Sequence, residues 1–199
     1  MVIPNASDFF AHVRTELFGG HMTESQVAGI NTIIAAWPDG TDYRWLAYAL
    51  ATALHETGRT MQPIEEWGKG KGRPYGVPAG PWHKVYDGRG LMQETWYSNY
   101  LHADNCLHAD GTLKENESLV ENPDLALRPD IAARIMVRGM SEAWFTGKKL
   151  SDYFNANQTD WVNARRIING LDKAAQIASY AVHFRRALDN PTSGIAHAS

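Results

Sequence analysis

Apolar residues at spacings of three and four place side chains along one face of a helix, and this pattern constrains the fold of the chain most strongly. One stripe follows Thr23 and Gln26, a pair with capping-box spacing, and stops at the turn-forming residues 38–40. The next stripe runs from about Thr41 to about Glu56. Its apolar members are Trp45, Leu46, Ala49, Leu50 and Ala53. We therefore expect a mainly α fold in which the second of these helices ends at a carboxylate.

Helical spacing returns in three later segments, after Pro129, over about 159–170, and in a last helix that ends before Asn190. Between residues 67 and 90 the sequence is rich in glycine and proline, which predicts loops or a short hairpin. The paired His-Ala-Asp sequences within residues 102–110 are expected in a loop. Binding groups often lie on such irregular segments when a rigid scaffold carries them.

The length of 199 residues suits one domain with a single substantial core. We assign residues 1–190 to that domain, with a small lobe around 60–125, and residues 191–199 to a flexible C-terminal tail. The 22 acidic and 19 basic residues give a net charge of −3, which provides no general attraction to nucleic acid. The basic pair Arg165-Arg166 is best explained as a solvated helix face.

A single cysteine, Cys106, excludes an internal disulfide framework and is typical of a protein that folds in a reducing compartment. The N-terminal residues have neither the basic nor the apolar region of a signal peptide, and we expect no transmembrane segment. We also expect no cofactor and no metal. The sequence His55-Glu56 is not a zinc-binding helix motif, because Arg59 stands where the second histidine would be required.

Glu56 is followed closely by a second acidic pair, Glu65-Glu66. Two carboxyl groups across a cleft can cleave a glycosidic bond, one as the acid that protonates the leaving oxygen and one as the base that organises water. The competing interpretation is a solvated glutamate at a helix end. A glycine turn at residues 88–90 then leads to Gln93, Thr95, Trp96 and Asn99, whose amide, hydroxyl and aromatic groups suit a sugar.

Three motifs occur in order: His-Glu-Thr-Gly from His55, Tyr-x-Gly-Arg-Gly-x-x-Gln-x-Thr-Trp-x-x-Asn-Tyr from Tyr86, and Arg-Arg-Ile-Ile-Asn-Gly from Arg165. In the second motif, Asp87 stands between Tyr86 and Gly88. Together the motifs resemble the glycoside hydrolase family 19 chitinases, and most of all their compact bacteriophage endolysin branch in the lysozyme superfamily. The resemblance covers about residues 46–188. It implies a lysozyme-like, two-lobed helical fold with a central cleft, and inverting cleavage of a β-1,4-linked amino-sugar polymer.

The resemblance also implies roles for individual residues. Glu56 matches the general acid, Glu65 fits the base better than Glu66, and Thr95 would help to hold the attacking water. Arg89 would orient a carboxylate, or form a structural salt bridge. The residues expected to bind substrate are His55, Gln93, Trp96, Asn99, Tyr100 and Asn169.

Two acids depart from the family pattern. Glu94 stands where the family usually has an apolar residue, so it could compete for the base role, but we expect it to face solvent. Asp87 precedes the glycine turn, and we expect its side chain to cap that turn.

The function that these features favour is an endolysin of muramidase type, which hydrolyses peptidoglycan during lysis of the host cell. It would act as a monomer on the glycan strand, remain in the host cytoplasm until a holin-type membrane partner releases it, and then reach the periplasm and cell wall. One alternative is a chitinase that acts on N-acetylglucosamine polymers. Another is an inactive glycan-binding or phage structural module.

Overall fold

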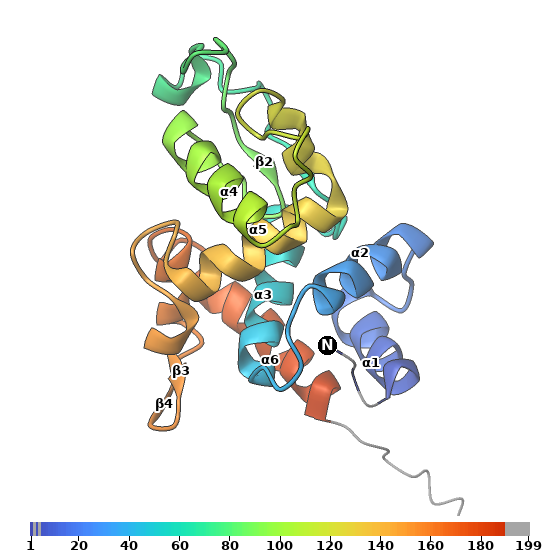
Figure 1. Ribbon diagram of the computed structural model, residues 1–199. Helices are drawn as coiled ribbons and strands as arrows, with labels where there is room; N and C mark the ends of the chain where they lie inside the picture. Colours follow the sequence, from blue (N-terminus) through green and yellow to red (C-terminus); the bar gives the residue numbers. More distant parts are fainter. Residues whose placement is uncertain (2, 4, 190–199) are drawn as a thin grey trace, which may run out of the picture.

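The computed structural model describes residues 1, 3 and 5–189, and the expected tail at 191–199 lies outside them (Figure 1). Within these residues the chain is mainly helical, as predicted. Its α-helices are α1 (Ala6–Phe18), α2 (Glu24–Ala35), α3 (Tyr43–Glu56), α4 (Tyr97–Ala109), α5 (Pro129–Glu142) and α6 (Ala174–Asp189).

Strands are short and occur as two antiparallel pairs. In the first pair, β1 (Ile64–Glu65) lies beside β2 (Arg89–Gly90), with Glu65 opposite Arg89. In the second, β3 (Phe154–Asn155) lies beside β4 (Gln158–Thr159). Single 3-10 turns fill several connections, namely η1 (Pro74–Gly76), η2 (Pro123–Leu127), η3 (Leu150–Asp152) and η4 (Asn163–Ile167). The glycine- and proline-rich segment 67–90 is therefore irregular, as its composition indicates.

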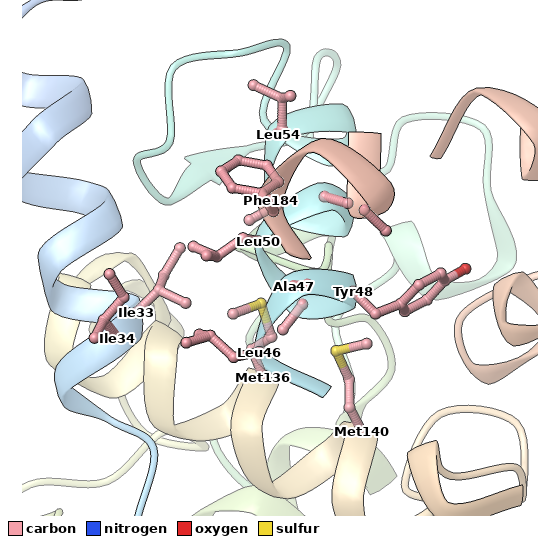
Figure 2. Packing of buried hydrophobic residues seen from close by; sticks show 14 of the residues in the cluster. Ile33, Ile34, Leu46, Ala47, Tyr48, Leu50, Leu54, Met136, Met140 and Phe184 are labelled. Atoms are coloured by element: carbon pink, nitrogen blue, oxygen red, sulfur yellow. The ribbon is translucent and has the colours of Figure 1, made fainter. Parts of the chain in front are cut away.

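The main core surrounds α3. All residues from 46 to 54 are buried, so this helix is covered on every side. It packs most extensively against α6, while α5 and α2 supply further apolar side chains (Figures 1 and 2). Figure 2 shows Leu50 and Leu54 beside Phe184 of α6, with Met136 and Met140 of α5 near the start of the helix. The last residue of α3, Glu56, is thereby attached to a rigid element.

A second apolar cluster lies beneath α4. It joins Tyr86, Tyr100 and Leu107 to Leu119 and to Ile131 at the start of α5. In Figure 1 this part of the chain forms the upper end of the molecule, and α5 runs from it into the main core. The two clusters give the helical fold two packed regions.

Local sequence signals explain where several helices start. Thr23 and Gln26 form both hydrogen bonds of the predicted capping box, and the side chain of Asp42 caps α3. Pro129 occupies the first turn of α5, as expected from its fixed φ.

Three local expectations need correction. The segment 102–110 is not a loop, because α4 continues through Ala109 and directs Ala103 and Leu107 into the second cluster. The segment 159–170 is not an α-helix, because it starts at the last residue of β4 and otherwise contains the short 3-10 helix η4. Helix α1 was not predicted, although Phe9, Val13 and Leu17 recur every four residues on its buried face.

No helix among the described residues is both long enough and apolar enough to span a lipid bilayer.

Candidate active site

Glu56 lies at the C-terminal end of α3 and is half-buried. Its Oε1 accepts a hydrogen bond from Nη1 of Arg165 at 2.6 Å. Arg165 is only 4% exposed, and its Nε donates to the carbonyl oxygen of Asp172 at 3.2 Å. A guanidinium held at two points fixes the carboxyl group that it binds, because both ends of the contact are immobile. Arg165 is therefore not the solvated residue that we expected.

The turn after Glu56 is fixed by Thr57 and by α2. The hydroxyl of Thr57 donates to the carbonyl of Ala53 at 2.7 Å and accepts from the amide of Met61 at 3.0 Å. Helix α2 approaches this turn so closely that a Cβ on Gly29 would lie 1.9 Å from the carbonyl oxygen of Met61. The backbone around Glu56 is thus supported from two sides.

Glu65 lies on β1 within an ionic network. Its carboxylate oxygens are 2.7 Å from Nζ of Lys69 and 3.2 Å from Nη2 of Arg89. The same guanidinium is 2.7 Å from Asp87 and 3.1 Å from Asp124. Arg89 consequently contacts Glu65 directly, and also forms the structural ion pairs that were the alternative interpretation.

Asp87 occupies the buried end of this network. It is 1% exposed, so it does not cap a surface turn as expected. Burial raises the pKa of its carboxyl group, and the nearby guanidinium of Arg89 acts in the opposite direction. An uncompensated buried charge is costly, and Arg89 supplies the compensating charge at this position.

Glu66 has a different environment from Glu65. Its Oε2 accepts from the hydroxyl of Tyr75 at 3.0 Å, and its Oε1 accepts from the amide of Gly88 at 3.2 Å. A Cβ on Gly88 would lie 3.2 Å from Cβ of Glu66 and 2.9 Å from Oε1 of Gln93, so a larger residue would crowd the pairing. Both oxygens of Glu66 thus hold the loop in place, whereas the oxygens of Glu65 contact the cationic groups of Lys69 and Arg89.

Thr95 lies between two residues with strained backbone. Gln93 has a φ of 54° and Trp96 a φ of 71°, both in the left-handed region that L residues seldom adopt. The side-chain nitrogen of Gln93 donates to the carbonyl of Ile64 at 3.1 Å, which ties this stretch to β1 beside Glu65. Backbone strain of this kind persists where surrounding contacts enforce it, and it is common at functional sites.

Aromatic side chains are exposed on the same part of the chain. Trp96 lies at the start of α4, and its ring meets the ring of Tyr75 edge-on at 5.7 Å. Trp67 is fully exposed. A groove of about 570 Å³ is lined by Glu65, Glu66, Trp67, Gly68 and Lys69. Flat apolar rings beside a carboxylate are suited to the faces and hydroxyl groups of a sugar.

Glu94 does not face solvent as expected, since it is 5% exposed. Burial raises the pKa of its carboxyl group to about 8, and the hydrogen-bonding side chain of Asn99 opposes that increase. Both residues line a pocket of about 310 Å³ together with His102, Glu142, Ala143 and Trp144. Glu94 forms no ion pair with the network around Arg89, and Asn99 lies at the wall of the pocket.

The other residues that were predicted to bind substrate differ in how exposed they are. Tyr100 is 1% exposed and donates to the carbonyl of Asp87 at 2.9 Å, so it supports the loop from below and cannot touch a sugar in this conformation. His55 is half-buried in the last turn of α3. Asn169 is exposed. Its backbone N–H donates to the backbone carbonyl of Arg165, so Asn169 lies near the residue that binds Glu56.

Comparison with solved structures places this arrangement in a known fold. Chitinase C from Streptomyces griseus superposes with a TM-score of 0.63 and 23% identity over 92% of this chain and 76% of that protein. The fold is that of the family GH19 chitinases. A family GH19, class IV chitinase from Zea mays matches with a TM-score of 0.55 and 18% identity over 94% of each chain. A mutant of chitinase C gives a TM-score of 0.59 at 22% identity.

No protein-family model matches the sequence, and a search of curated proteins finds no relative. The relationship to the GH19 fold is therefore visible in the arrangement of the helices. At the identities found, the likeness establishes the fold.

Two supporting residues in this GH19-like fold were missed by sequence reasoning. Arg165 belongs to the third motif, and its position there was the signal that could have distinguished it from an ordinary surface arginine. Tyr75 lies in the glycine-rich loop with no comparable signal. Among the described residues, no group of three or more His, Cys, Asp or Glu side chains is placed to hold a metal. The carboxyl groups are the candidates for acid and base chemistry at this site.

Proposed function

We propose that this protein hydrolyses β-1,4 glycosidic bonds of an amino-sugar polymer, with Glu56 as general acid and Glu65 as general base. The observation that carries the proposal is the pairing of each acid with its own buried arginine, Glu56 with Arg165 and Glu65 with Arg89, in the fold of the GH19 chitinases. Separate positioning of two carboxyl groups is what a single-displacement reaction requires, because one must protonate the leaving oxygen while the other activates water.

In the proposed reaction Glu56 transfers a proton to the glycosidic oxygen as the bond to the anomeric carbon breaks. Glu65 accepts a proton from a water molecule, whose oxygen forms the new bond on the opposite face of the ring. Thr95 helps to hold this water, and Gln93 and Asn99 bind the sugar. The product has an inverted anomeric configuration, and both carboxyl groups return to their starting states when they exchange a proton with solvent.

We further propose that the polymer is bacterial peptidoglycan and that the protein is an endolysin. The ordered motifs that resemble the compact endolysin branch support this assignment. In that role the protein would act as a monomer, remain in the host cytoplasm until a holin-type partner opens the membrane, and then reach the cell wall. A chitinase is the second candidate, because the similar solved structures are chitinases.

Digestion of purified peptidoglycan and of chitin oligomers tests both substrates. Mass spectrometry of the products identifies the new reducing end. Muramic acid ends indicate a muramidase, glucosamine ends change the assigned linkage, and cleavage of chitin oligomers alone supports the chitinase. A glycan-binding module without activity would cleave neither polymer.

Three matched variants test the residue roles. Glu56→Gln and Glu65→Gln are each expected to lower kcat by about 10²- to 10⁴-fold while glycan binding is retained, since an amide cannot exchange the required proton. Glu66→Gln is the control, and its effect should be much smaller because Glu66 transfers no proton in the proposed reaction and a glutamine keeps one acceptor oxygen for the loop. Proton NMR of fresh products reports the anomer. Retained configuration, or a larger loss in Glu66→Gln than in Glu65→Gln, would contradict the proposed mechanism.

A further inference from the structure

A buried carboxyl group forms part of the pocket between the start of α4 and the end of α5. Glu94 Oε2 is buried and has no hydrogen-bond partner among the described residues. The pocket, of about 310 Å³, is also lined by Asn99 and Trp144. Because burial raises the pKa of Glu94 to about 8, this group carries a proton at neutral pH. The ion pairs of Glu65 do not use it.

The charged groups around the pocket are already engaged with other partners. Glu142 pairs with Arg138 at 2.8 Å and accepts from Nε1 of Trp144 at 3.0 Å. His102 lies edge-on to the ring of Trp144 at 4.8 Å. Asn99 lines the same pocket as Glu94, and its side-chain amide is the group that opposes the raised pKa of Glu94.

Groups on the other side of Glu94 are engaged in the same way. The backbone of Arg89 forms two hydrogen bonds with the backbone of Glu94. The guanidinium of Arg89 instead contacts Glu65, Asp87 and Asp124. The hydroxyl of Tyr100 donates to the carbonyl of Asp87. The proton on Glu94 is therefore governed by its burial and by Asn99.

The protonation state of a carboxyl group decides what it can offer to an amide. A neutral carboxyl group has an O–H that can donate to Oδ1 of Asn99, which leaves the amide NH₂ free to face the pocket. An ionised carboxylate can only accept, so it binds that NH₂ and leaves Oδ1 facing the pocket. The two states thus present opposite hydrogen-bonding groups to a ligand.

We propose that Glu94 is a positioning residue whose proton determines which end of the Asn99 amide faces the pocket, and hence how well glycan is bound. The role in glycan binding rests on the function proposed above. With Glu94 neutral, the NH₂ of Asn99 faces the pocket and can donate to an acceptor such as the carbonyl oxygen of an acetamido group. With Glu94 ionised, that donor is lost.

Kinetics as a function of pH test the proposal. Between about pH 6 and about pH 10, KM of the unmodified protein should rise about fivefold to tenfold as Glu94 ionises, the effect of one lost hydrogen bond. KM is the readout, because kcat also depends on the proton of Glu56 and should change with pH in the unmodified protein and in the Glu94 variants alike. Glu94→Gln keeps a donor, so its KM should stay low throughout. Glu94→Leu offers no partner to Asn99, so its KM should be raised at every pH.

His102→Gln is the matched control, because His102 is another titratable side chain of the same pocket. It should keep the alkaline rise in KM. An alkaline rise that persists in Glu94→Gln, that disappears in His102→Gln, or that is absent from the unmodified protein would overturn the proposal.

NMR of the free protein tests the pairing without relying on catalysis. The side-chain carboxyl carbon of Glu94 and the side-chain NH₂ of Asn99 should titrate with one shared midpoint, and the NH₂ response should vanish in Glu94→Gln. If the Glu94 and Asn99 signals share a midpoint in a protein that cleaves no glycan, the proposed function is wrong and the Glu94–Asn99 pairing is supported. If the protein cleaves glycan but the NH₂ of Asn99 does not follow Glu94, the inference fails.

Discussion

The two proposed catalytic carboxyl groups are supported in different ways. Glu56 ends a helix whose residues 46–54 are all buried, so apolar packing fixes its backbone, and one ion pair with the buried Arg165 fixes its carboxyl group. Glu65 lies on a two-residue strand, next to an irregular loop, and an ionic network around Arg89 fixes its position. Apolar packing responds to pH and to moderate salt less than a network of charge pairs does. The region around Glu56 and the region around Glu65 should therefore lose their structure under different conditions.

The first prediction concerns the region around Glu56. Leu50→Ala removes a fully buried side chain and should lower the free energy of unfolding by about 3–5 kcal/mol, because a cavity is left in the core. Urea denaturation followed by circular dichroism measures the change. Since α3 carries the core, the loss should appear across the whole domain. A loss confined to the region around β1 would contradict the comparison.

The second prediction concerns the region around Glu65. Arg89→Ala leaves Asp87 buried without its compensating charge, and the local cost should be about 3 kcal/mol. Hydrogen exchange should speed up in residues 64–66 and 87–94, while α3 remains protected. Asp124→Asn is the control, because Asp124 is exposed and its pair with Arg89 should contribute less than about 1 kcal/mol. Equal acceleration in α3 would show that the two regions are not separate.

The third prediction uses the pH dependence of Glu94, a buried acid that takes no part in the ionic network. The pKa of Glu94 is raised from 4.5 to about 8, so the folded protein binds more protons than the unfolded chain between those values, and stability falls as pH rises through that window. Glu94→Leu removes this loss. Its stability relative to the unmodified protein should rise with pH between about 4.5 and about 8, by up to a few kcal/mol, and then stay constant.

Thermal unfolding at several pH values measures this difference. The advantage of Glu94→Leu should be smallest at about pH 4, where Glu94 is neutral in both the folded and the unfolded chain. An advantage that is the same at every pH would indicate a packing effect and not the removal of a titrating group.

The smallest effect is expected at Tyr75. Tyr75→Phe removes one hydrogen bond to Glu66 and should cost about 1 kcal/mol, since the remaining oxygen of Glu66 keeps its bond to Gly88. Hydrogen exchange of the amide of Gly88 is the measurement. An effect as large as that of Arg89→Ala would mean that the loop depends on Glu66 and not mainly on the ionic network.

The features that the sequence predicts correctly depend on residues that lie close together in the chain. The capping box at Thr23 and the apolar stripe that ends at Glu56 depend on neighbours three and four residues away, so the pattern itself contains the information. Helix α4 also had such a signal at Tyr100, Ala103 and Leu107, which the polar residues between them obscured.

The parts that could not be predicted depend on distant contacts. Arg165 binds a carboxyl group 109 positions earlier in the chain, and no periodicity within its own segment indicates that partner. The same limit explains the errors at Glu94 and Asp87, two acids whose sequence surroundings suggest exposure. Their burial is created by α4, by α5 and by the guanidinium of Arg89, which the fold brings to them.

The contact between Gly29 and Met61 has a consequence for natural variation. Every amino acid other than glycine carries a Cβ, and at this position that atom would overlap the carbonyl oxygen of Met61. Gly29 lies on the face of α2 that supports the turn after Glu56. A genetic screen for inactive alleles should therefore recover substitutions at this codon, and homologous genes should retain glycine there even where the surrounding helix has diverged.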